Sequence, residues 1–213
     1  IVVWADVDND GDLDAFSGVA TNPDPAQPDN DDRSEILIND GTGHFSLGSG
    51  GDFRYPQGRP VTFGAAFTDF DRDGFVDLWL GFAMGREQPG MDRLFRGDGT
   101  GLFSDVTASM GLSTKGWSSV DDIREGRAHR NTWGVTACDL DGDGRPELLS
   151  SVYGRYFNAL WQGGDGGYVD ASMASGFAAD EDLDWTTNLN AQCYCKLHPA
   201  APDRRQPGQR FEQ

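Results

Sequence analysis

Short apolar runs recur along this 213-residue chain, and each is bounded by Gly, Asp, Asn or Pro. The runs are rich in β-branched and aromatic side chains, which is typical of β-strands joined by tight turns. Little of the chain has a helical pattern, apart from one turn expected at 105–110. The expected strands, in chain order, are 1–5, 13–19, 34–38 and 44–47, then 61–68, 76–83, 93–95 and 102–106, then 132–138, 147–153, 156–161 and 168–170.

The polar segments between these strands repeat in a fixed order. A nine-residue acidic motif, D-x-D-x-D-G-x-x-[DE], occupies 6–14, 69–77 and 139–147. A glycine-rich turn follows each copy, at 39–45, 96–103 and 162–168. Asp-Gly and Gly-Thr-Gly sequences provide the positive φ angles that tight hairpins need. The two motifs therefore divide the chain into three units of four strands.

Four-stranded antiparallel units that recur at a nearly fixed period predict the blades of a β-propeller. The predicted fold class is all-β, with about three four-stranded blades of a larger, about seven-bladed propeller. Residues 1–178 would hold the three blades, at about 1–60, 61–131 and 132–178. The last residues, 179–213, are expected to form a loop or the start of a further blade, followed by a ragged tail rich in Pro, Arg and Gln.

The chain is strongly acidic, which limits the partners that it can bind. The sequence has 35 Asp and Glu residues against 17 Lys and Arg, a net charge of −18. A nucleic-acid partner is therefore not expected, because its phosphates would be repelled. Aromatic residues make up 11% of the chain, too many for a disordered acidic protein. No run of 18 apolar residues predicts a membrane span.

The acidic motifs place so many carboxylates in nine residues that they repel one another unless a cation lies among them. Alternate positions converge, Gly at position 6 permits the reversal, and position 7 offers a carbonyl oxygen. Such hard oxygen ligands favour Ca²⁺ over Mg²⁺ and Zn²⁺. An EF-hand is excluded, because position 12 is not Glu and the flanks are strands. The predicted ligands of three Ca²⁺ sites are Asp6, Asp8, Asp10, the Asp12 carbonyl and Asp14; Asp69, Asp71, Asp73, the Phe75 carbonyl and Asp77; and Asp139, Asp141, Asp143, the Arg145 carbonyl and Glu147.

The acidic loop between strands, with Phe63-Gly64-Ala65-Ala66-Phe67-Thr68 before one copy, resembles the FG-GAP/VCBS repeats of integrin-α-like β-propellers. Segments 39–45 and 103–112 are similar to the branch that includes cartilage acidic protein and bacterial proteins with an ASPIC/UnbV tail. This resemblance covers about residues 1–178. It implies Ca²⁺ at the propeller rim, an extracellular, cell-surface or periplasmic location, and a role in adhesion, recognition or scaffolding. The third loop departs from the pattern with Pro146 and Glu147, and the 213 residues contain no ASPIC/UnbV-like segment.

Other candidate sites are less specific. The sequence Arg96-Gly97-Asp98 spells the RGD triplet that integrins bind, but the repeat already explains it as part of a glycine-rich turn. The three histidines, His44, His129 and His198, are too scattered to form a metal cluster. The three cysteines, Cys138, Cys193 and Cys195, are expected to be free thiols, with disulfides to residues outside this sequence as the alternative.

Two inserts interrupt the repeats, at 22–33 and 113–131. The second concentrates basic and aromatic side chains and is a candidate contact for a protein or glycan partner, although a solvated connection is the favoured interpretation. These side chains are Trp117, Arg124, Arg127, His129 and Arg130.

The sequence as a whole predicts a calcium-binding, non-enzymatic propeller segment that acts in extracellular recognition, adhesion or scaffolding. Its expected partners are an unidentified protein or glycan ligand and the remaining propeller blades of the parent protein. No nucleophile-elbow, zinc-protease, P-loop or dinucleotide-binding motif is present. A propeller enzyme acting on polysaccharide, as a lyase or hydrolase, stays open because acid pairs for such chemistry need only the right spatial separation. A lectin is the other alternative.

Overall fold

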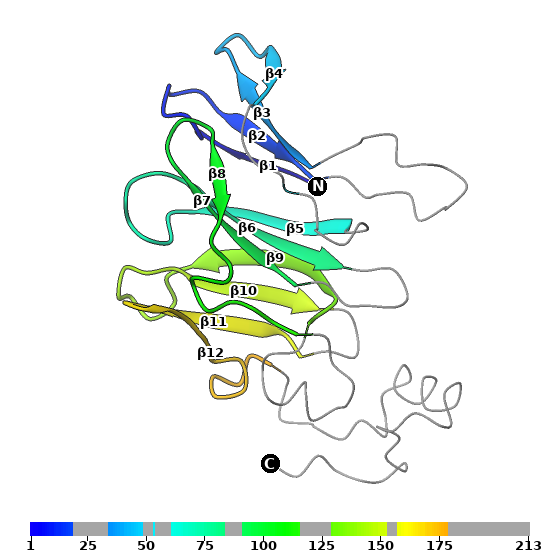
Figure 1. Cartoon of the computed structure of the whole chain (residues 1–213), viewed down its shortest axis with the longest axis vertical. Helices are drawn as coiled ribbons and strands as arrows, with labels where there is room; N and C mark the ends of the chain where they lie inside the picture. The colour runs from blue at the N-terminus through cyan, green and yellow to red at the C-terminus, as the bar shows by residue number, and fades with distance from the viewer. Residues whose placement is uncertain are drawn as a thin grey trace, which may run out of the picture.

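In the computed structural model the chain is all-β, with three four-stranded antiparallel sheets (Figure 1). The structure describes residues 1–18, 34–48, 53, 61–83, 91–115, 129–152 and 157–178. No helix occurs among these residues, and hence none of a length and apolarity that would cross a membrane. We call the sheets blades 1, 2 and 3 in chain order.

Each blade is a meander in which strands that follow one another in the sequence are hydrogen-bonded neighbours. Blade 1 contains β1 (Val2–Ala5), β2 (Asp14–Ser17), β3 (Glu35–Asn39) and β4 (Phe45–Leu47). Blade 2 contains β5 (Val61–Thr68), β6 (Asp77–Ala83), β7 (Arg93–Gly97) and β8 (Phe103–Asp105). Blade 3 contains β9 (Thr132–Cys138), β10 (Glu147–Val152), β11 (Ala159–Gly164) and β12 (Gly167–Asp170). The predicted all-β class with four-stranded blades is confirmed.

The expected strand positions differ most from the structure at β11. This strand was expected at 156–161 but spans Ala159–Gly164. Its C-terminal end is extended because Gly164 pairs with Gly167 across a tight two-residue turn, so that the ladder continues to the tip of the hairpin. The corresponding strands of blades 1 and 2 stop before a longer glycine-rich loop.

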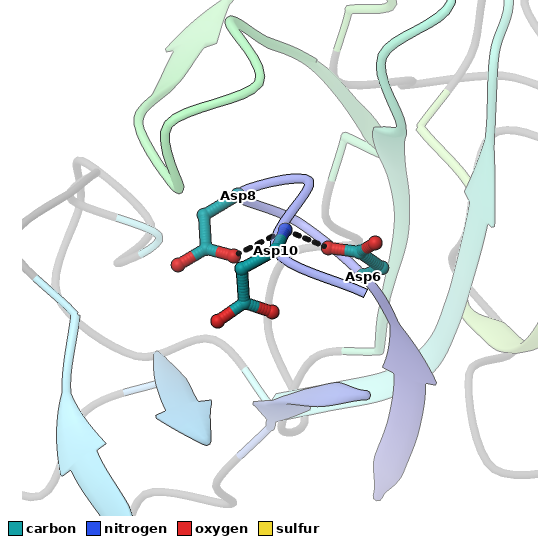
Figure 2. A group of neighbouring side chains, drawn as sticks. All are labelled: Asp6, Asp8 and Asp10. Atoms are coloured by element: carbon teal, nitrogen blue, oxygen red, sulfur yellow. Dashed lines mark hydrogen bonds between the residues drawn. The ribbon is translucent and has the colours of Figure 1, made fainter. Parts of the chain in front are cut away.

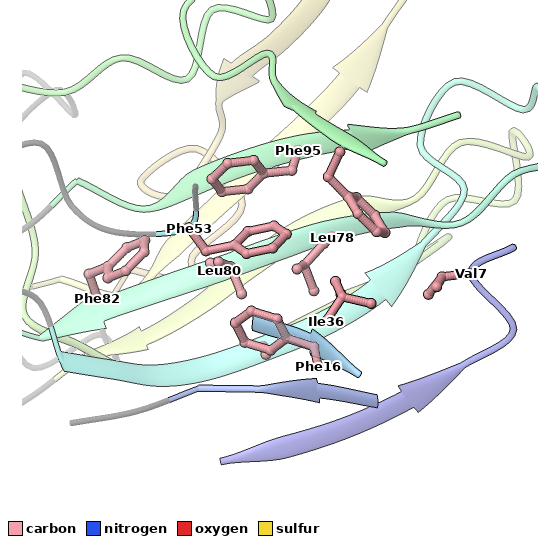
Figure 3. Close-up of a cluster of buried hydrophobic side chains, with 10 residues drawn as sticks. Val7, Phe16, Ile36, Phe53, Leu78, Leu80, Phe82 and Phe95 are labelled. Atoms are coloured by element: carbon pink, nitrogen blue, oxygen red, sulfur yellow. The ribbon is translucent and has the colours of Figure 1, made fainter. Parts of the chain in front are cut away.

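Neighbouring blades pack face to face through two apolar clusters. Between blades 1 and 2, Phe16 and Ile36 lie against Leu78 and Phe95, with Phe53 among them (Figure 3). The second cluster, between blades 2 and 3, includes the buried side chains of Phe70, Trp79, Leu94, Leu112, Leu148, Ala159, Trp161 and Tyr168. Because successive side chains of a strand point to opposite faces, the central blade contributes to both clusters, and β6 is buried along its whole length.

The first strands of successive blades are neighbours, since β1 lies beside β5 and β5 lies beside β9. This is the arrangement of innermost strands in a propeller. Gly64 permits the close approach of β5 to β9, since a Cβ there would lie 2.7 Å from the Val135 nitrogen and 3.0 Å from the Gly134 carbonyl carbon. Beside this contact the rings of Phe63 and Trp133 stack, with centroids 5.1 Å apart.

Replacing Gly64 by Ala is expected to lower the free energy of unfolding by about 1–3 kcal/mol, because the added methyl group would overlap with backbone that cannot move without shifting a blade. Gly166→Ala is the matched control, since a Cβ at that turn meets nothing within 4 Å. Urea denaturation of both variants measures the effect. Equal stability of the two variants would show that the blades do not approach as closely as the structure has it.

Blade 1 exposes apolar side chains at positions that are buried in blade 2. Val2 is 51% exposed and Phe45 is 37% exposed. The repeat aligns Val2 with Ala65 and Phe45 with Phe103, which are both buried against blade 1. The difference arises because, among the described residues, no sheet packs on this face of blade 1.

A second repeated segment follows the last strand of blades 2 and 3, at 103–112 and 168–177. Thr107 and Ser172 occupy equivalent positions, and each hydroxyl donates a hydrogen bond to the aspartate two residues earlier. Thr107 also accepts a hydrogen bond from the backbone nitrogen of Leu94, at 3.0 Å. The hydroxyl therefore ties the segment to the third strand of its blade. The single helical turn expected at 105–110 is a hydrogen-bonded turn in the structure, in which the Met110 nitrogen donates to the Val106 carbonyl.

Several predicted features lie outside the described residues. These are the insert at 22–33, the side chains Trp117, Arg124 and Arg127, and the segment 179–213 with Cys193, Cys195 and His198. Cys138 at the end of β9 is exposed and forms no disulfide with a described residue.

Candidate metal centres

The first acidic loop, loop 1 (residues 6–14), brings three carboxylates together (Figure 2). Asp6, Asp8 and Asp10 each offer an oxygen atom, and these atoms lie within 4.8 Å of one another. The Asp10 nitrogen donates hydrogen bonds to Oδ1 of Asp6 and Oδ1 of Asp8, at 3.2 and 3.3 Å (Figure 2). The Gly11 nitrogen donates to the other Asp6 oxygen. The loop backbone thus holds the first two aspartates on the same side of the turn.

The turn depends on left-handed backbone at positions 4 and 6 of the motif. In loop 1 these are Asn9, with φ 61°, and Gly11, with φ 95°. The sixth position is glycine in all three loops, because few other residues adopt this conformation without strain. The fourth is Asn9, Arg72 or Gly142, and all three have positive φ.

The second loop, loop 2 (residues 69–77), groups Asp69, Asp71 and Asp77, whose oxygen atoms also lie within 4.8 Å of one another. Asp77 is fully buried. Burial raises the pKa of its carboxyl to about 7, against the opposing effect of hydrogen bonds from the Phe70 and Gly97 nitrogens. The charges of Asp71 and Asp73 raise this pKa further. In loop 1, burial raises the pKa of Asp8, and the neighbouring carboxylates add to the shift. Both shifts mark clusters in which negative charge is unfavourable on its own.

The third loop, loop 3 (residues 139–147), groups Asp139, Asp141 and Glu147 in the same way. Glu147 is buried, and its Oε2 accepts a hydrogen bond of 2.7 Å from the Leu140 nitrogen. Its Oε1 is buried too and accepts no hydrogen bond from any described residue. Such an unpaired buried oxygen is costly. The substitution of Glu for Asp thus keeps a carboxylate in the cluster.

The ninth residue of loops 1 and 2 also has a structural role that sequence reasoning missed. Asp14 accepts a hydrogen bond from the Val7 nitrogen and another from the Asn39 nitrogen, each at 2.9 Å. Asp77 makes the same pair of contacts in blade 2. This carboxylate therefore joins the start of the acidic loop to the end of the third strand. In the sequence, the ninth acid and the start of the next glycine-rich turn recur together in blades 1 and 2, and this recurrence is the signal that could have indicated the bond.

The structure does not bring every predicted ligand into the three close groups. Asp14 is absent from the group in loop 1, and Asp73 and Asp143 are absent from those in loops 2 and 3. The fifth-position acids Asp10, Asp73 and Asp143 each accept a hydrogen bond from the backbone nitrogen of the seventh residue. The carbonyl oxygens of these seventh residues, Asp12, Phe75 and Arg145, stay predicted ligands.

A side chain from the third strand reaches the second acid of the loop in blades 2 and 3. In blade 2 the Arg96 guanidinium lies 2.6 Å from Asp71 Oδ2. Gln162, the equivalent residue of blade 3, donates to Asp141 Oδ2 at 3.1 Å. Arg96 is also the first residue of the RGD triplet. Its ion pair fits the interpretation of that triplet as part of the repeat.

One residue of the second insert, Arg130, does not fit the prediction that the insert contacts a partner. Arg130 is buried, lies 2.8 Å from Asp170 and is 5.7 Å from the centre of the Trp161 ring. It is a structural residue, because its charge is paired inside blade 3. His129 is half-buried and forms a hydrogen bond with Thr114, and burial lowers its pKa.

Comparison with known proteins adds one match and one negative result. No curated protein matches this chain. The ASPIC/UnbV likeness therefore stays a prediction. Residues 69–150, which run from loop 2 of blade 2 through most of β10 in blade 3, match the FG-GAP-like repeat family and contain two of the three acidic motifs.

Proposed function

We propose that the chain binds Ca²⁺ in its three acidic loops and serves as a non-enzymatic recognition, adhesion or scaffold module outside the cell. FG-GAP-like repeats are typical of propeller modules of extracellular and surface proteins, and residues 69–150 carry this repeat. Each loop groups three carboxylates at one point. Hard oxygen donors in a flexible loop are the ligands that Ca²⁺ prefers.

The observation that carries the metal proposal is the unpaired Oε1 of Glu147. A buried carboxylate oxygen without a donor costs on the order of 1–3 kcal/mol, and here Asp139 and Asp141 add negative charge within 4.8 Å. A hydrogen-bond donor would relieve the first problem but not the second. A divalent cation relieves both. The residues present therefore fit Ca²⁺, with Asp139, Asp141 and Glu147 as side-chain ligands.

Loops 1 and 2 carry the same motif, and each also brings three carboxylates together, with the ninth residue in the group of loop 2 and the fifth in that of loop 1. Their backbone hydrogen bonds are the same, from the nitrogen of the fifth residue to the first and second acids. Asp77 resembles Glu147 in being a carboxylate that is buried among other carboxylates. This burial is the main cause of the raised pKa of Asp77. We therefore infer one Ca²⁺ in each loop.

A binding role without catalysis is the simplest consequence of this use of the acids. The conspicuous carboxylates belong to the three loops, where each bonds to backbone nitrogens of its own turn. These acids stabilise the loop through hydrogen bonds and would bind the cation, so they are not available for acid–base catalysis. The metal would join the first and second strands of each blade, and the rims of the blades would carry the contacts to a ligand.

Metal counting tests the proposal. Equilibrium dialysis followed by elemental analysis is expected to find three Ca²⁺ per chain, and Glu147→Gln is expected to lower this to two. Glu35→Gln, which makes the same chemical change on β3 outside the loops, is the matched control and should keep all three. No bound Ca²⁺, or an unchanged count in the Glu147 variant, would contradict the assignment.

A further inference from the structure

A pocket of about 380 Å³ lies between blades 2 and 3, on the rim that carries the acidic loops. Phe70 and Asp71 of loop 2 and Arg96 of β7 line it from blade 2. Blade 3 contributes Arg145 of loop 3 and the tip of the β11–β12 hairpin, residues 163–168. Its volume is within the range of about 300–1,000 Å³ that is usual for small-molecule sites.

Two guanidinium groups enter this pocket, although the chain has twice as many acidic as basic residues. Arg96 is paired with Asp71 at 2.6 Å, and Arg145 with Asp165. The Arg96 side chain is 45% exposed, so a ligand can reach it. A planar guanidinium binds a carboxylate through two parallel hydrogen bonds, which makes a pair of arginines a specific site for an anionic carboxylate group.

Both ion pairs can open. The Asp165 side chain is 96% exposed at the hairpin tip, and an exposed pair of this kind contributes little free energy. Asp71 is shared, because it belongs to the close carboxylate group of loop 2 as well as to the pair with Arg96. A cation in loop 2 would neutralise Asp71 and weaken its attraction for Arg96. This step rests on the calcium sites proposed above.

The rest of the lining selects among carboxylate ligands. The Asp71 and Asp165 carboxylates accept hydrogen bonds and can receive hydroxyl groups. Phe70 and Tyr168 also line the pocket, but both side chains are almost fully buried between the blades, so its polar groups carry the selection. A neutral sugar would leave the guanidiniums unused, and a simple anion would leave the acceptors unused. A uronic acid offers a carboxylate and hydroxyl groups together.

We propose that this inter-blade pocket binds an acidic sugar unit, with the ligand carboxylate between Arg96 and Arg145 and its hydroxyl groups toward Asp71 and Asp165. Calcium in loop 2 strengthens binding by releasing Arg96 from Asp71. This proposal names a ligand class for the recognition role of the module. It also gives the Arg96 of the RGD triplet a function within the chain.

Isothermal titration of the chain with D-glucuronate, in Ca²⁺ and in EDTA, tests the proposal. Binding is expected in Ca²⁺, at least fivefold weaker in EDTA, and at least tenfold weaker for D-glucose. Arg96→Gln, which copies the Gln162 of blade 3, and Arg145→Gln should each weaken glucuronate binding about tenfold. Lys115→Gln removes the same charge from an exposed position outside the acidic loops that does not line the pocket, and it should leave the affinity within twofold.

The outcomes separate this proposal from that of calcium binding. Three bound Ca²⁺ without glucuronate binding would overturn the pocket alone. Glucuronate binding that needs both arginines, in a chain that takes up no Ca²⁺, would support the pocket and overturn the metal sites. Equal binding of glucose, equal binding of an acidic tripeptide, or full affinity in the Arg96 and Arg145 variants would each overturn the acidic-sugar assignment.

Discussion

Adding about 10 mM Ca²⁺ to the metal-free chain is expected to raise its melting temperature by about 10–25 °C, and excess EDTA is expected to reverse the rise. Calcium sites of extracellular modules have dissociation constants of about 10⁻⁴ to 10⁻³ M. Such sites would each gain about 1.4–2.7 kcal/mol under these conditions. Three sites that bind the folded chain alone add these gains, and each kcal/mol moves the melting temperature of a chain of this size by about 2–4 °C.

The structural reason is that each loop concentrates charge which folding alone does not neutralise. Asp77 and Glu147 are buried, and an oxygen atom of each lies within 4.8 Å of oxygen atoms of two other carboxylates. In the unfolded chain these groups are hydrated and far apart, so the metal-free folded state is penalised. A cation removes this penalty in the folded state only.

Controls separate specific binding from general screening of a chain with net charge −18. NaCl at matched ionic strength should give a small part of the rise, because it only screens. Mg²⁺ should also give less, because it requires a tighter octahedral geometry and retains its waters. Scanning calorimetry measures all conditions. A melting temperature that is the same in Ca²⁺ and in EDTA would exclude structural calcium in this chain.

Much of this architecture could be predicted from sequence because its determinants are local. The acidic loops recur with fixed spacing, and the left-handed backbone at Gly11 and its counterparts follows from the motif itself. The strands between them could be placed within a few residues for the same reason. The error at β11 came from the turn at 165–166, which is tighter than the turns of blades 1 and 2 and so lets pairing continue.

What the sequence could not predict depends on contacts between distant segments. The motif named Asp14 as a metal ligand, but its hydrogen bond to the Asn39 nitrogen joins residues 25 positions apart. Arg130 was a candidate partner contact within a solvated insert, because its burial against Trp161 depends on how blade 3 closes. The side chain that reaches loop 2 from β7, Arg96, was visible only as part of a triplet with another known meaning.

A fourth contact of this distant kind lies at Asp92, which no motif includes. Its carboxylate is buried between blades 2 and 3. It accepts hydrogen bonds from the Phe82 nitrogen at 3.1 Å, from the Thr132 hydroxyl at 2.9 Å and from the Ser150 hydroxyl at 2.7 Å. One donor belongs to β6 and two to β9 and β10, so this single side chain joins the two blades.

Asp92→Ala is expected to lower the free energy of unfolding at neutral pH by about 2–4 kcal/mol, because it leaves a backbone amide and two hydroxyls buried without an acceptor. Asp92→Asn should cost less, since it keeps one carbonyl acceptor and the volume of the side chain. Asp165→Ala removes the same charge from an exposed turn and should change stability by less than about 0.5 kcal/mol. Urea denaturation compares the three, and a loss in Asp92→Ala no larger than in Asp165→Ala would contradict the role of Asp92.

The pH dependence of the Asp92→Asn variant tests the same contact through the charge. Burial raises the pKa of Asp92 to about 6, although hydrogen bonds from Ser150, Phe82 and Thr132 and the charge of Arg130 oppose the shift. In the unfolded chain an aspartate titrates near pH 4. The folded state therefore holds this proton more tightly, and the resulting stability is present below pH ~4 and lost as the pH rises through about 6. Asn cannot ionise, so the advantage of the wild type over Asp92→Asn should shrink by about 2–3 kcal/mol between pH 4 and pH 7. A constant difference over this range would mean that Asp92 ionises freely and does not lie between the blades.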